Sequence, residues 1–329
     1  MRLVHKYGGS SVATPEKIMA IARRLAQLKK EGKDLVVVCS AMGKTTNGLI
    51  ALARQVNPSP SKREMDALLS TGEIQTVSLM AMALQALRAD AISMTGFQSG
   101  FITNAVHSKA FIKEINTQRV EQYLDEGKIV VVAGFQGITE DGHITTLGRG
   151  GSDTTAVAIA AKLDCPCEIY TDVDAVYRVD PRIYPNAKPL SRISYEEMME
   201  MAALGAGVLE TRSVELAKKY GVELYLGRTL EEGKKGTTVM SQQVFFEEMP
   251  VTGISIKEHC AIVTFRHMDY NAGTAASIFR LISRNNINLD MINQTILDGK
   301  VAFSFSCSDE QAAELEEALG REPEEKALV

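Results

Sequence analysis

A glycine-rich run that leads directly into an alanine-rich helix constrains the fold of this chain more than any other stretch. The run covers residues 145–155 and follows an apolar segment at residues 129–133 that predicts a buried strand. Glycines let a backbone approach a ligand closely, and the first turn of a helix presents unpaired N–H groups that favour an anion. We expect one of the polar residues at positions 152–155 to cap the helix. The simpler alternative is a tight turn that binds nothing.

A second glycine turn, Lys6–Ser11, lies between a strand predicted at residues 2–5 and a helix that starts at Thr14-Pro15. Threonine followed by proline is typical of a helix N-terminus. Polar loops also follow the apolar strand at residues 35–39 and the strand at residues 168–174, which ends in acids. In open α/β sheets, ligands bind outside the carboxyl ends of the strands. The sequence therefore predicts an α/β fold with its site where these strands end.

The amino-acid composition limits the kinds of molecule that this protein can bind. The chain has 329 residues, 45% of them hydrophobic, and a net charge of -5, which suits two domains and argues against nucleic acid as the main partner. The longest apolar runs, such as Leu35–Cys39, are too short to span a membrane, and no secretory signal precedes the first strand. The five cysteines and five histidines form no metal-binding motif. We therefore expect a cytoplasmic protein with no membrane partner and no metal site built by its own side chains.

The chain predicts a domain boundary where glycines, charges and a proline gather after residue 229. We place a first domain at residues 1–240, a linker at 241–250 and a second domain at 251–329. The second domain has the β-α-β-β-α order of a ferredoxin-like unit, whose last strand would fall at residues 326–329. Its expected strands are 261–265, 289–294 and 301–307, and its expected helices are 275–285 and 309–319.

Seven short motifs, in order along the first domain, resemble those of the aspartate kinases in the amino acid kinase family. They are Lys6–Ser11, Ser40–Gly43, Gly72-Glu73, Gly134–Gly137, Thr146–Thr155, Tyr170–Asp174 and Asp180–Arg182. The remainder of the chain resembles an ACT domain. The resemblance implies a three-layer sandwich around a central, mostly parallel sheet, plus a small ferredoxin-like α+β domain. It also implies ATP and L-aspartate as substrates, Mg²⁺ as cofactor, and the first step toward lysine, threonine, methionine and diaminopimelate.

The resemblance also implies a role for individual residues. Lys6 would bridge the phosphates of ATP, and Asp153 would help to position Mg²⁺ or Lys6. Arg149 would bind the α-carboxylate of aspartate in bidentate fashion, and Glu73 would meet its ammonium group. The other implied substrate residues are Ser40, Thr46, Asp125, Gly150, Gly151 and Ser152. The other implied nucleotide residues are Tyr7, Gly8, Gly9, Ser152, Thr171, Asp172, Tyr177 and Arg182.

One motif departs from the family pattern. Many relatives carry Gly-Ala-Lys-Val-Leu-His-Pro where this chain has Gly-Ala-Gly-Val-Leu-Glu-Thr at residues 205–211. The lysine that contacts the nucleotide in those relatives is absent. In this chain the nucleotide contact of that lysine is either missing or made by the backbone at Gly207 and Val208.

The second domain carries the expectations about regulation and assembly. In aspartate kinases this region usually holds two interleaved ACT units that bind lysine or threonine at an interface, whereas here one nearly complete unit precedes the last residue, Val329. An incomplete last strand would expose a sheet edge, so we expect a homo-oligomer, most simply a dimer. The family's Asp-Lys-Pro-Gly loop is replaced by residues 270–273, with Asp269 one position early. Asn288, Asp290 and Gln294 still match, and we expect weak feedback inhibition or none.

The leading hypothesis is the reaction of ATP with L-aspartate to give ADP and 4-phospho-L-aspartate. The attacking carboxylate is already ionised at neutral pH, so no general base is needed. Catalysis would then consist of positioning and charge neutralisation. Two alternatives remain open: a kinase for glutamate, acetylglutamate or a nucleotide, and a non-catalytic amino-acid sensor with a degenerate kinase domain.

Overall fold

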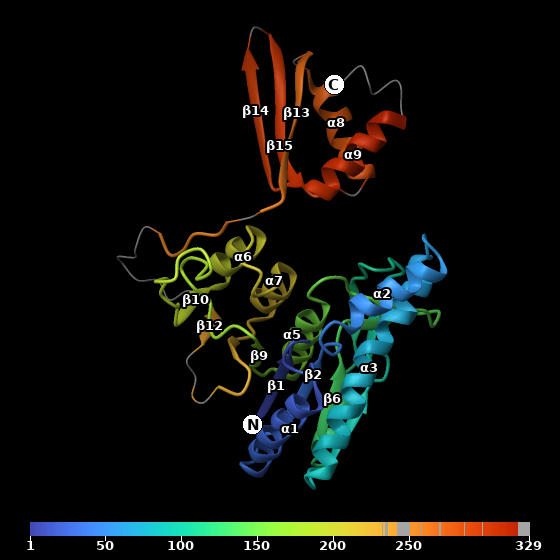
Figure 1. The fold of residues 1–329 in the computed structure, drawn as a ribbon, viewed down its shortest axis with the longest axis vertical. Coiled ribbons are helices and arrows are strands. Elements are labelled where there is room, and N and C mark those ends of the chain that lie inside the picture. The colour runs from blue at the N-terminus through green and yellow to red at the C-terminus, as the bar shows by residue number, and fades with distance from the viewer. Residues whose placement is uncertain are drawn as a thin grey trace. The chain divides into compact units, whose positions relative to one another are not determined.

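The structure is a computed structural model that describes residues 1–231, 233, 236–241, 251–256, 258–269, 271–285, 287–297 and 299–321. The chain divides into two compact units, Met1–Ile256 and Lys257–Val329 (Figure 1). Most of the predicted linker, at 242–250, and the last strand predicted at 326–329 lie outside the described residues. Each unit is described by itself below.

The first unit alternates strands and helices along most of its length. Its elements are β1 (Arg2–Tyr7), α1 (Pro15–Lys30), β2 (Asp34–Cys39), α2 (Thr45–Val56), α3 (Lys62–Ala86), β3 (Ala91–Met94), β4 (Phe101–Thr103), β5 (Ile112–Ile115), α4 (Gln118–Asp125), β6 (Ile129–Ala133), β7 (Gln136–Ile138), β8 (Ile144–Thr146), α5 (Gly151–Leu163), β9 (Cys167–Thr171), β10 (Arg192–Ser194), α6 (Tyr195–Ala203), α7 (Thr211–Tyr220), β11 (Leu224–Arg228) and β12 (Thr237–Met240).

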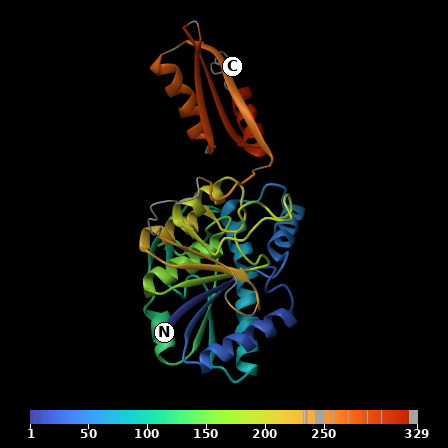
Figure 2. The same cartoon turned by 90° about the vertical axis from the view of Figure 1, so that its left-hand side faces the viewer.

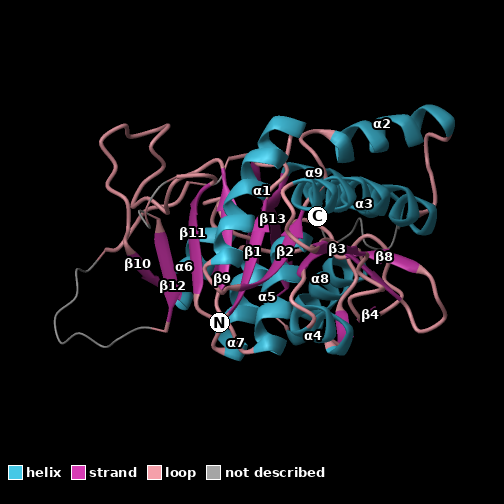
Figure 3. Ribbon diagram, turned by 90° about the horizontal axis from the view of Figure 1, so that it is seen from below, coloured by secondary structure: helices cyan, strands magenta, loops and turns pink. Residues whose placement is uncertain are grey.

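An eight-stranded sheet in the order β10-β12-β11-β9-β1-β2-β6-β3 forms the centre of this unit. Every neighbouring pair is parallel except β11 with β12. The sheet lies between helices (Figure 2). Helices α1 and α3 cover one face, while α4, α5 and α7 cover the other (Figure 3). This arrangement confirms the predicted three-layer α/β sandwich with a mostly parallel sheet.

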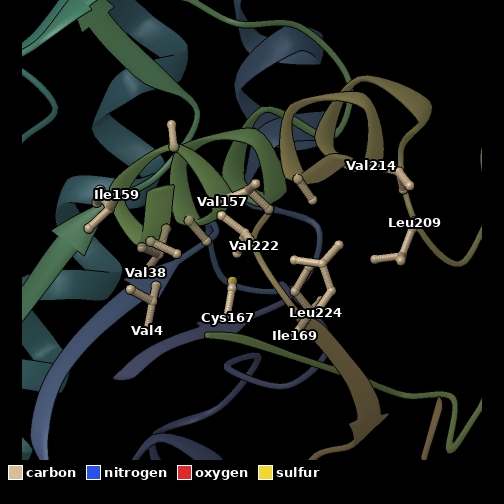
Figure 4. Packing of buried hydrophobic residues seen from close by; sticks show 14 of the residues in the cluster. Val4, Val38, Val157, Ile159, Cys167, Ile169, Leu209, Val214, Val222 and Leu224 are labelled. Atoms are coloured by element: carbon tan, nitrogen blue, oxygen red, sulfur yellow. The ribbon is translucent and has the colours of Figure 1, made fainter. Parts of the chain in front are cut away.

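The strands are apolar on both faces because each face is buried under helices. In β2, Val36 and Val38 face the core layer beneath α5, whereas Leu35 and Val37 face the layer beneath α1 and α3. Helix α5 places Val157 and Ile159 against this sheet, and the side chains interleave with those of the strands (Figure 4). The continuous apolar run of β2 is thus explained by burial on both sides.

The strand ends are aligned in register at one edge of the sheet. Ala133 of β6 pairs with Cys39 of β2, Cys39 pairs with Tyr7 of β1, and Tyr7 pairs with Tyr170 of β9. The loops that leave these four strands therefore begin side by side, at the carboxyl edge where α/β proteins bind their ligands.

A small four-stranded sheet, β5-β4-β7-β8, delivers the glycine-rich run to that edge. Strands β7 and β8 pair antiparallel as a hairpin, and residue 147 follows β8 directly. The hydroxyls of Thr103 and Thr145 lie 2.6 Å apart and join β4 to β8 inside the sheet. The start of the glycine-rich run is therefore held in place by the four-stranded sheet.

Helix α3 runs without a break over 25 residues, through Gly72. A Cβ at Gly72 would lie 2.9 Å from Cβ of Ala41, so glycine is needed there for close packing and not for a kink. By length and composition α3 is also long and apolar enough to cross a membrane, which an inspection of uninterrupted apolar runs overlooks. Half of that stretch is buried inside this fold, with the carboxylates of Asp66 and Glu73 among its buried groups, so in this structure α3 serves as a core helix.

The second unit has the predicted β-α-β-β-α order. Its sheet has the order β13-β15-β14, with both outer strands antiparallel to β15. A small core that includes Phe265, Phe303 and Phe305 lies between this sheet and its helices. The described side chains of β14 are exposed. The elements are β13 (Cys260–Asp269), α8 (Ala272–Arg284), β14 (Met291–Leu297), β15 (Lys300–Ser308) and α9 (Asp309–Arg321).

Leu84→Ala should destabilise the first unit, because Leu84 is fully buried on α3 and its loss leaves a cavity. Such truncations cost about 2–5 kcal/mol of the free energy of unfolding. The matched control is Leu79→Ala on the same helix, where the leucine is 41% exposed and the change should stay within about 0.5 kcal/mol. Urea denaturation followed by circular dichroism measures both. Equal losses in the two variants would contradict the position assigned to α3.

Candidate active site

A cavity of about 590 Å³ opens at the carboxyl edge of the sheet, between the strand-end loops, α3 and the start of α5. It gathers residues that are far apart in the sequence. The predicted site residues that line it are Lys6, Gly9, Ser40, Thr46, Glu73, Arg149, Gly150, Gly151, Ser152 and Asp153. The structure therefore brings most of the predicted substrate residues to one place.

Two opposite charges meet inside this cavity. Lys6 Nζ lies 2.6 Å from Asp153 Oδ1, and the two residues are only 8% and 9% exposed. Lys6 is the last residue but one of β1, and Asp153 lies in the first turn of α5, so the pair joins the strand to the helix. The lysine ammonium is a compact charge on a flexible stem, which suits contact with phosphate oxygens.

The first turn of α5 is left open toward a ligand. Gly150 is the N-cap residue, with φ of 64°, and no side chain in the described part of the chain caps the helix, so the prediction of a cap among residues 152–155 is wrong. The hydroxyls of Thr154 and Thr155 instead bond back to the carbonyls of Gly150 and Gly151. An uncapped N-terminus offers N–H groups and the positive end of the helix dipole to an anion.

Two glycines allow the loops around the cavity to approach closely. A Cβ at Gly134 would lie 2.7 Å from the Ser152 hydroxyl, and a Cβ at Gly9 would lie 2.7 Å from the carbonyl oxygen of Ala41. Side chains are excluded at both positions because real Cβ contacts are not that short. The glycines therefore let α5 approach the end of β6 and let the loop after β2 approach the turn after β1.

Glu73 places a buried carboxylate on the α3 side of the cavity. Its Oε1 accepts a hydrogen bond from the Ala41 N–H at 3.1 Å, whereas Oε2 is buried and has no hydrogen-bond partner among the described residues. Burial raises the pKa of Glu73 to about 7, and the bond from Ala41 opposes that rise. A ligand cation beside Oε2 would provide the missing partner.

Arg149 places a cation on another part of the wall. It is exposed and has no ion-pair partner among the described residues. Glu210, at the N-cap of α7, lies against Gly150 and occupies the space that a Cβ there would need. Burial raises the pKa of Glu210, with a further rise from Asp153 and an opposing effect of Arg149 and Arg212. An arginine fork without a protein partner suits a ligand carboxylate.

A second group of predicted residues lies beside Gly8, at the end of β9. The Gly8 N–H donates to the carbonyl of Tyr170 at 3.1 Å, and the Thr171 hydroxyl donates to Asp172 at 2.8 Å. Tyr7 contributes only backbone to this edge, because its ring is buried and stacks on Tyr170 at 5.4 Å. The predicted nucleotide residues along the edge are Tyr7, Gly8, Thr171, Asp172 and Tyr177.

Other predicted residues lie elsewhere. Asp125 pairs with Arg2 at 3.2 Å, at the start of β1 and thus at the opposite edge of the sheet, so its predicted place near the substrate is wrong. The Arg182 side chain is 87% exposed and pairs with Asp180 at 2.6 Å, outside the cavity lining. Gly207 and Val208 lie in the turn between α6 and α7, where a Cβ on Gly207 would meet nothing within 4 Å.

A buried polar network supports the strand ends from beneath. His5 Nε2 lies 3.1 Å from Glu168 Oε2, which also accepts the Tyr170 hydroxyl at 2.7 Å. Arg24 donates to the Tyr170 hydroxyl at 3.3 Å. Burial, together with Glu168, raises the pKa of Tyr170. The network ties β1, β9 and α1 together below the cavity.

Several cavity residues were not predicted as site residues. Asn47 and Ile50 lie on α2, a helix absent from the sequence predictions although Gly43 stands before it and Pro58 after it. Ser108 lies in a loop that contains no recognised motif. Thr146 belongs to the glycine-rich run, but no site role is predicted for it. Only the tertiary packing places them there.

Comparison with known proteins gives the class of this chain. The amino acid kinase family matches residues 1–227. An aspartokinase of Mycolicibacterium smegmatis is 47% identical over 324 residues, which cover 96% of this chain and 77% of that protein. The crystal structure of aspartate kinase from Synechocystis matches with a TM-score of 0.66 at 39% identity, covering 97% of this chain and 55% of that chain. E. coli aspartokinase III, in complex with aspartate and ADP, matches in fold with a TM-score of 0.75 at 23% identity, covering 97% of this chain and 83% of that one.

The fold, the strand-end cavity and the family match show that this chain belongs to the amino acid kinase family. Within that family it groups with the aspartokinases, as the identity to the mycobacterial and Synechocystis proteins shows.

Glu73→Gln should stabilise the ligand-free protein increasingly as pH rises from about 4.5 to about 7. The unfolded wild type loses the proton near the lower value and the folded protein keeps it to about 7, so the wild type loses stability between them. Glutamine mimics the protonated form and does not titrate, so the advantage should level off near 3 kcal/mol at most, on the order set by the shift. Urea denaturation across this pH range measures it, with exposed Glu140→Gln as control. A pH-independent difference would contradict the burial argument.

Proposed function

We propose that this chain transfers the γ-phosphoryl group of ATP to the side-chain carboxylate of L-aspartate, giving ADP and 4-phospho-L-aspartate. One observation carries the proposal. A single cavity holds a buried carboxylate with one oxygen that has no hydrogen-bond partner among the described residues, an arginine that has no ion-pair partner among them, and the Lys6–Asp153 pair. An α-amino acid carries the complementary ammonium and carboxylate groups.

The cavity suggests how the amino acid would bind. Glu73 would pair with the ammonium group through its free oxygen, and Arg149 would bind the α-carboxylate with its planar fork. Ser40, Thr46 and the backbone of Gly150 and Gly151 would supply further hydrogen bonds. The side-chain carboxylate would then be directed toward Lys6.

The neighbouring edge suggests how the nucleotide would bind. The backbone at Tyr7, Gly8 and Gly9 and the first turn of α5 at Ser152 would contact the phosphates. Thr171, Asp172 and Tyr177 would contact the rest of the nucleotide. Arg182, Gly207 and Val208 would take part only at the outer rim, since they lie outside the cavity lining.

The reaction needs little from the protein besides position and charge. The acceptor carboxylate is ionised at neutral pH, so it can attack the γ-phosphorus in line as the bond to the ADP oxygen breaks. Lys6 would stabilise the negative charge that spreads over the phosphoryl oxygens, and Asp153 would hold Lys6 in place.

The residues present fit a nucleotide-bound Mg²⁺. Among the described residues no group of three or more His, Cys, Asp or Glu could hold a metal ion. Mg²⁺ is usually held by one or two carboxylates together with substrate phosphates and water, so Asp153 alone can suffice from the protein. When bound, the ion would neutralise phosphate charge.

The alternatives fit less well. A kinase for acetylglutamate would have no use for the unpaired carboxylate of Glu73, since the acetylated nitrogen carries no positive charge. A glutamate kinase would need a cavity long enough for the one additional methylene group of the glutamate side chain. A sensor with a degenerate kinase domain does not account for an intact Lys6–Asp153 pair. As an aspartokinase the chain would catalyse the first step toward lysine, threonine, methionine and diaminopimelate, and we expect it to act in the cytoplasm.

The wild-type chain should release ADP with ATP and L-aspartate, and not with L-glutamate or N-acetyl-L-glutamate. Arg149→Ala should then raise the aspartate KM roughly 30-fold or more. The reason is the loss of a charge-assisted pair worth on the order of 2–5 kcal/mol. The ATP KM should stay within about twofold, since Arg149 contacts no nucleotide in this scheme. A coupled ADP-release assay measures both, with exposed Arg23→Ala as the matched control. An unchanged aspartate KM would exclude the role given to Arg149.

We also propose that the second unit is an ACT-like regulatory domain that works as a two-fold dimer. Asp269 ends β13, whereas Asn288 and Asp290 precede β14. Both strands run antiparallel to β15, so these residues lie at opposite ends of one sheet. The four predicted effector residues, Asp269, Asn288, Asp290 and Gln294, therefore do not meet within one unit, and an effector site would need a second copy. Asp269 is also engaged by Lys300 at 2.5 Å.

Lysine and threonine should inhibit the kinase weakly or not at all, since the effector loop departs from the family and Asp269 already has a partner. Light scattering should give about twice the chain mass of 35.8 kDa. Titration of each amino acid into the ADP-release assay measures the first expectation. Strong inhibition at low effector concentration would overturn the regulatory part, and a monomer mass would overturn the assembly part.

A further inference from the structure

The reaction scheme above leaves one buried charge without a role. Asp66 lies on α3, is fully buried and lines no part of the cavity. A buried carboxylate is costly unless it is hydrogen-bonded, so its partners show what it does.

Among the described residues, the groups that donate hydrogen bonds to Asp66 are all far away in the sequence. The Ser108 N–H donates to both of its oxygens, at 3.1 and 2.9 Å, and the Ser108 hydroxyl lies at 3.4 Å. The Thr146 hydroxyl donates at 2.6 Å, and His107 Nδ1 donates at 2.9 Å. One carboxylate thus joins helix α3 to a loop near residue 108 and to the end of β8.

The groups that Asp66 holds form the wall of the cavity next to Arg149. Ser108 and Thr146 both line the cavity. Ser108 has a left-handed backbone, with φ of 69°, which a serine rarely adopts without outside support. Its carbonyl would lie 3.1 Å from a Cβ on Gly148, the residue before Arg149. The Ala110 N–H donates to the Thr146 carbonyl at 2.9 Å, so the loop and the glycine run are held as one piece.

Helix α3 also carries Glu73, seven residues after Asp66. Seven residues are almost two turns, so both carboxylates point in nearly the same direction, about 10 Å apart along the helix. One of them faces the cavity directly, and the other anchors the segment that precedes Arg149. The helix therefore sets the spacing between the carboxylate and the arginine on the cavity wall.

We propose that Asp66 is a positioning residue that fixes Arg149 relative to Glu73 and so sets the fit of the amino-acid substrate. The proposal rests on the function proposed above, in which these two residues bind the α-carboxylate and the ammonium group. It leaves the nucleotide side of the site independent of Asp66.

The test compares Asp66→Asn with the wild type and with Asp34→Asn. Asp34 also accepts a hydrogen bond, from Lys29 at 3.0 Å, but it starts β2 and lies at the opposite edge of the sheet. Asp66→Asn should raise the aspartate KM about tenfold or more, the loss expected from charge-assisted hydrogen bonds, and leave the ATP KM within about twofold. Asp34→Asn should leave both unchanged. A residue that merely stabilised the fold would raise both constants or neither, and either result would overturn the proposal.

A second variant covers the case in which Asp66→Asn fails to fold. Thr146→Val keeps the shape of the side chain and removes only the hydroxyl that bonds Asp66. It should raise the aspartate KM less than Asp66→Asn would and leave the ATP KM within about twofold, and an unchanged aspartate KM would overturn the proposal. Where Asp66→Asn folds, the double variant should resemble Asp66→Asn alone because the two changes break one network. Independent, additive effects would overturn the proposal. A wild type that releases no ADP with aspartate would instead refute the proposed function, so the two failures are distinguishable.

Discussion

The in-register parallel pairing of β6, β2, β1 and β9 is the constraint on which the site depends. Because Ala133, Cys39, Tyr7 and Tyr170 lie in one row, the loops that follow these strands start side by side. A shift of one residue in any pair would turn the alternating side chains to the other face of the sheet. The geometry of the cavity is therefore a consequence of the sheet, and the apolar layers beneath α5 and beneath α1 and α3 hold that register.

The site holds several charged side chains in a buried place, where removing a charge from water costs free energy. Lys6 and Asp153 compensate each other at 2.6 Å, Asp66 is satisfied by its hydrogen bonds, and Glu73 is left with one oxygen free. An unpaired carboxylate in such surroundings responds by holding its proton more tightly. The free protein thus keeps a group that only a cationic ligand can fully satisfy, whereas Lys6, Asp153 and Asp66 already have partners within the protein.

The sequence predicts the parts of this site that need a particular local backbone. Glycine turns at strand ends can be predicted from the sequence, because few residues other than glycine tolerate close contacts such as that of Gly134 with Ser152. The place of Ser108 cannot be predicted, since it depends on packing between distant segments, whereas α2 has no buried residue and lies between the local signals of Gly43 and Pro58. The cap expected among residues 152–155 failed because Thr154 and Thr155 bond to carbonyls of their own turn. Asp125 failed because it ends the helix that directly precedes β6, which places it at the amino edge of the parallel sheet, away from the loops that follow the strands.

The stacked rings of Tyr7 and Tyr170 have an optical consequence. The chain contains no tryptophan and nine tyrosines, so its intrinsic ultraviolet emission comes from tyrosine. These two rings lie 5.4 Å apart, directly below the strand ends, and the Tyr170 hydroxyl is bonded to Glu168. Their light absorption and emission therefore respond to the packing of β1 against β9 in the core layer beneath α1, without any added label.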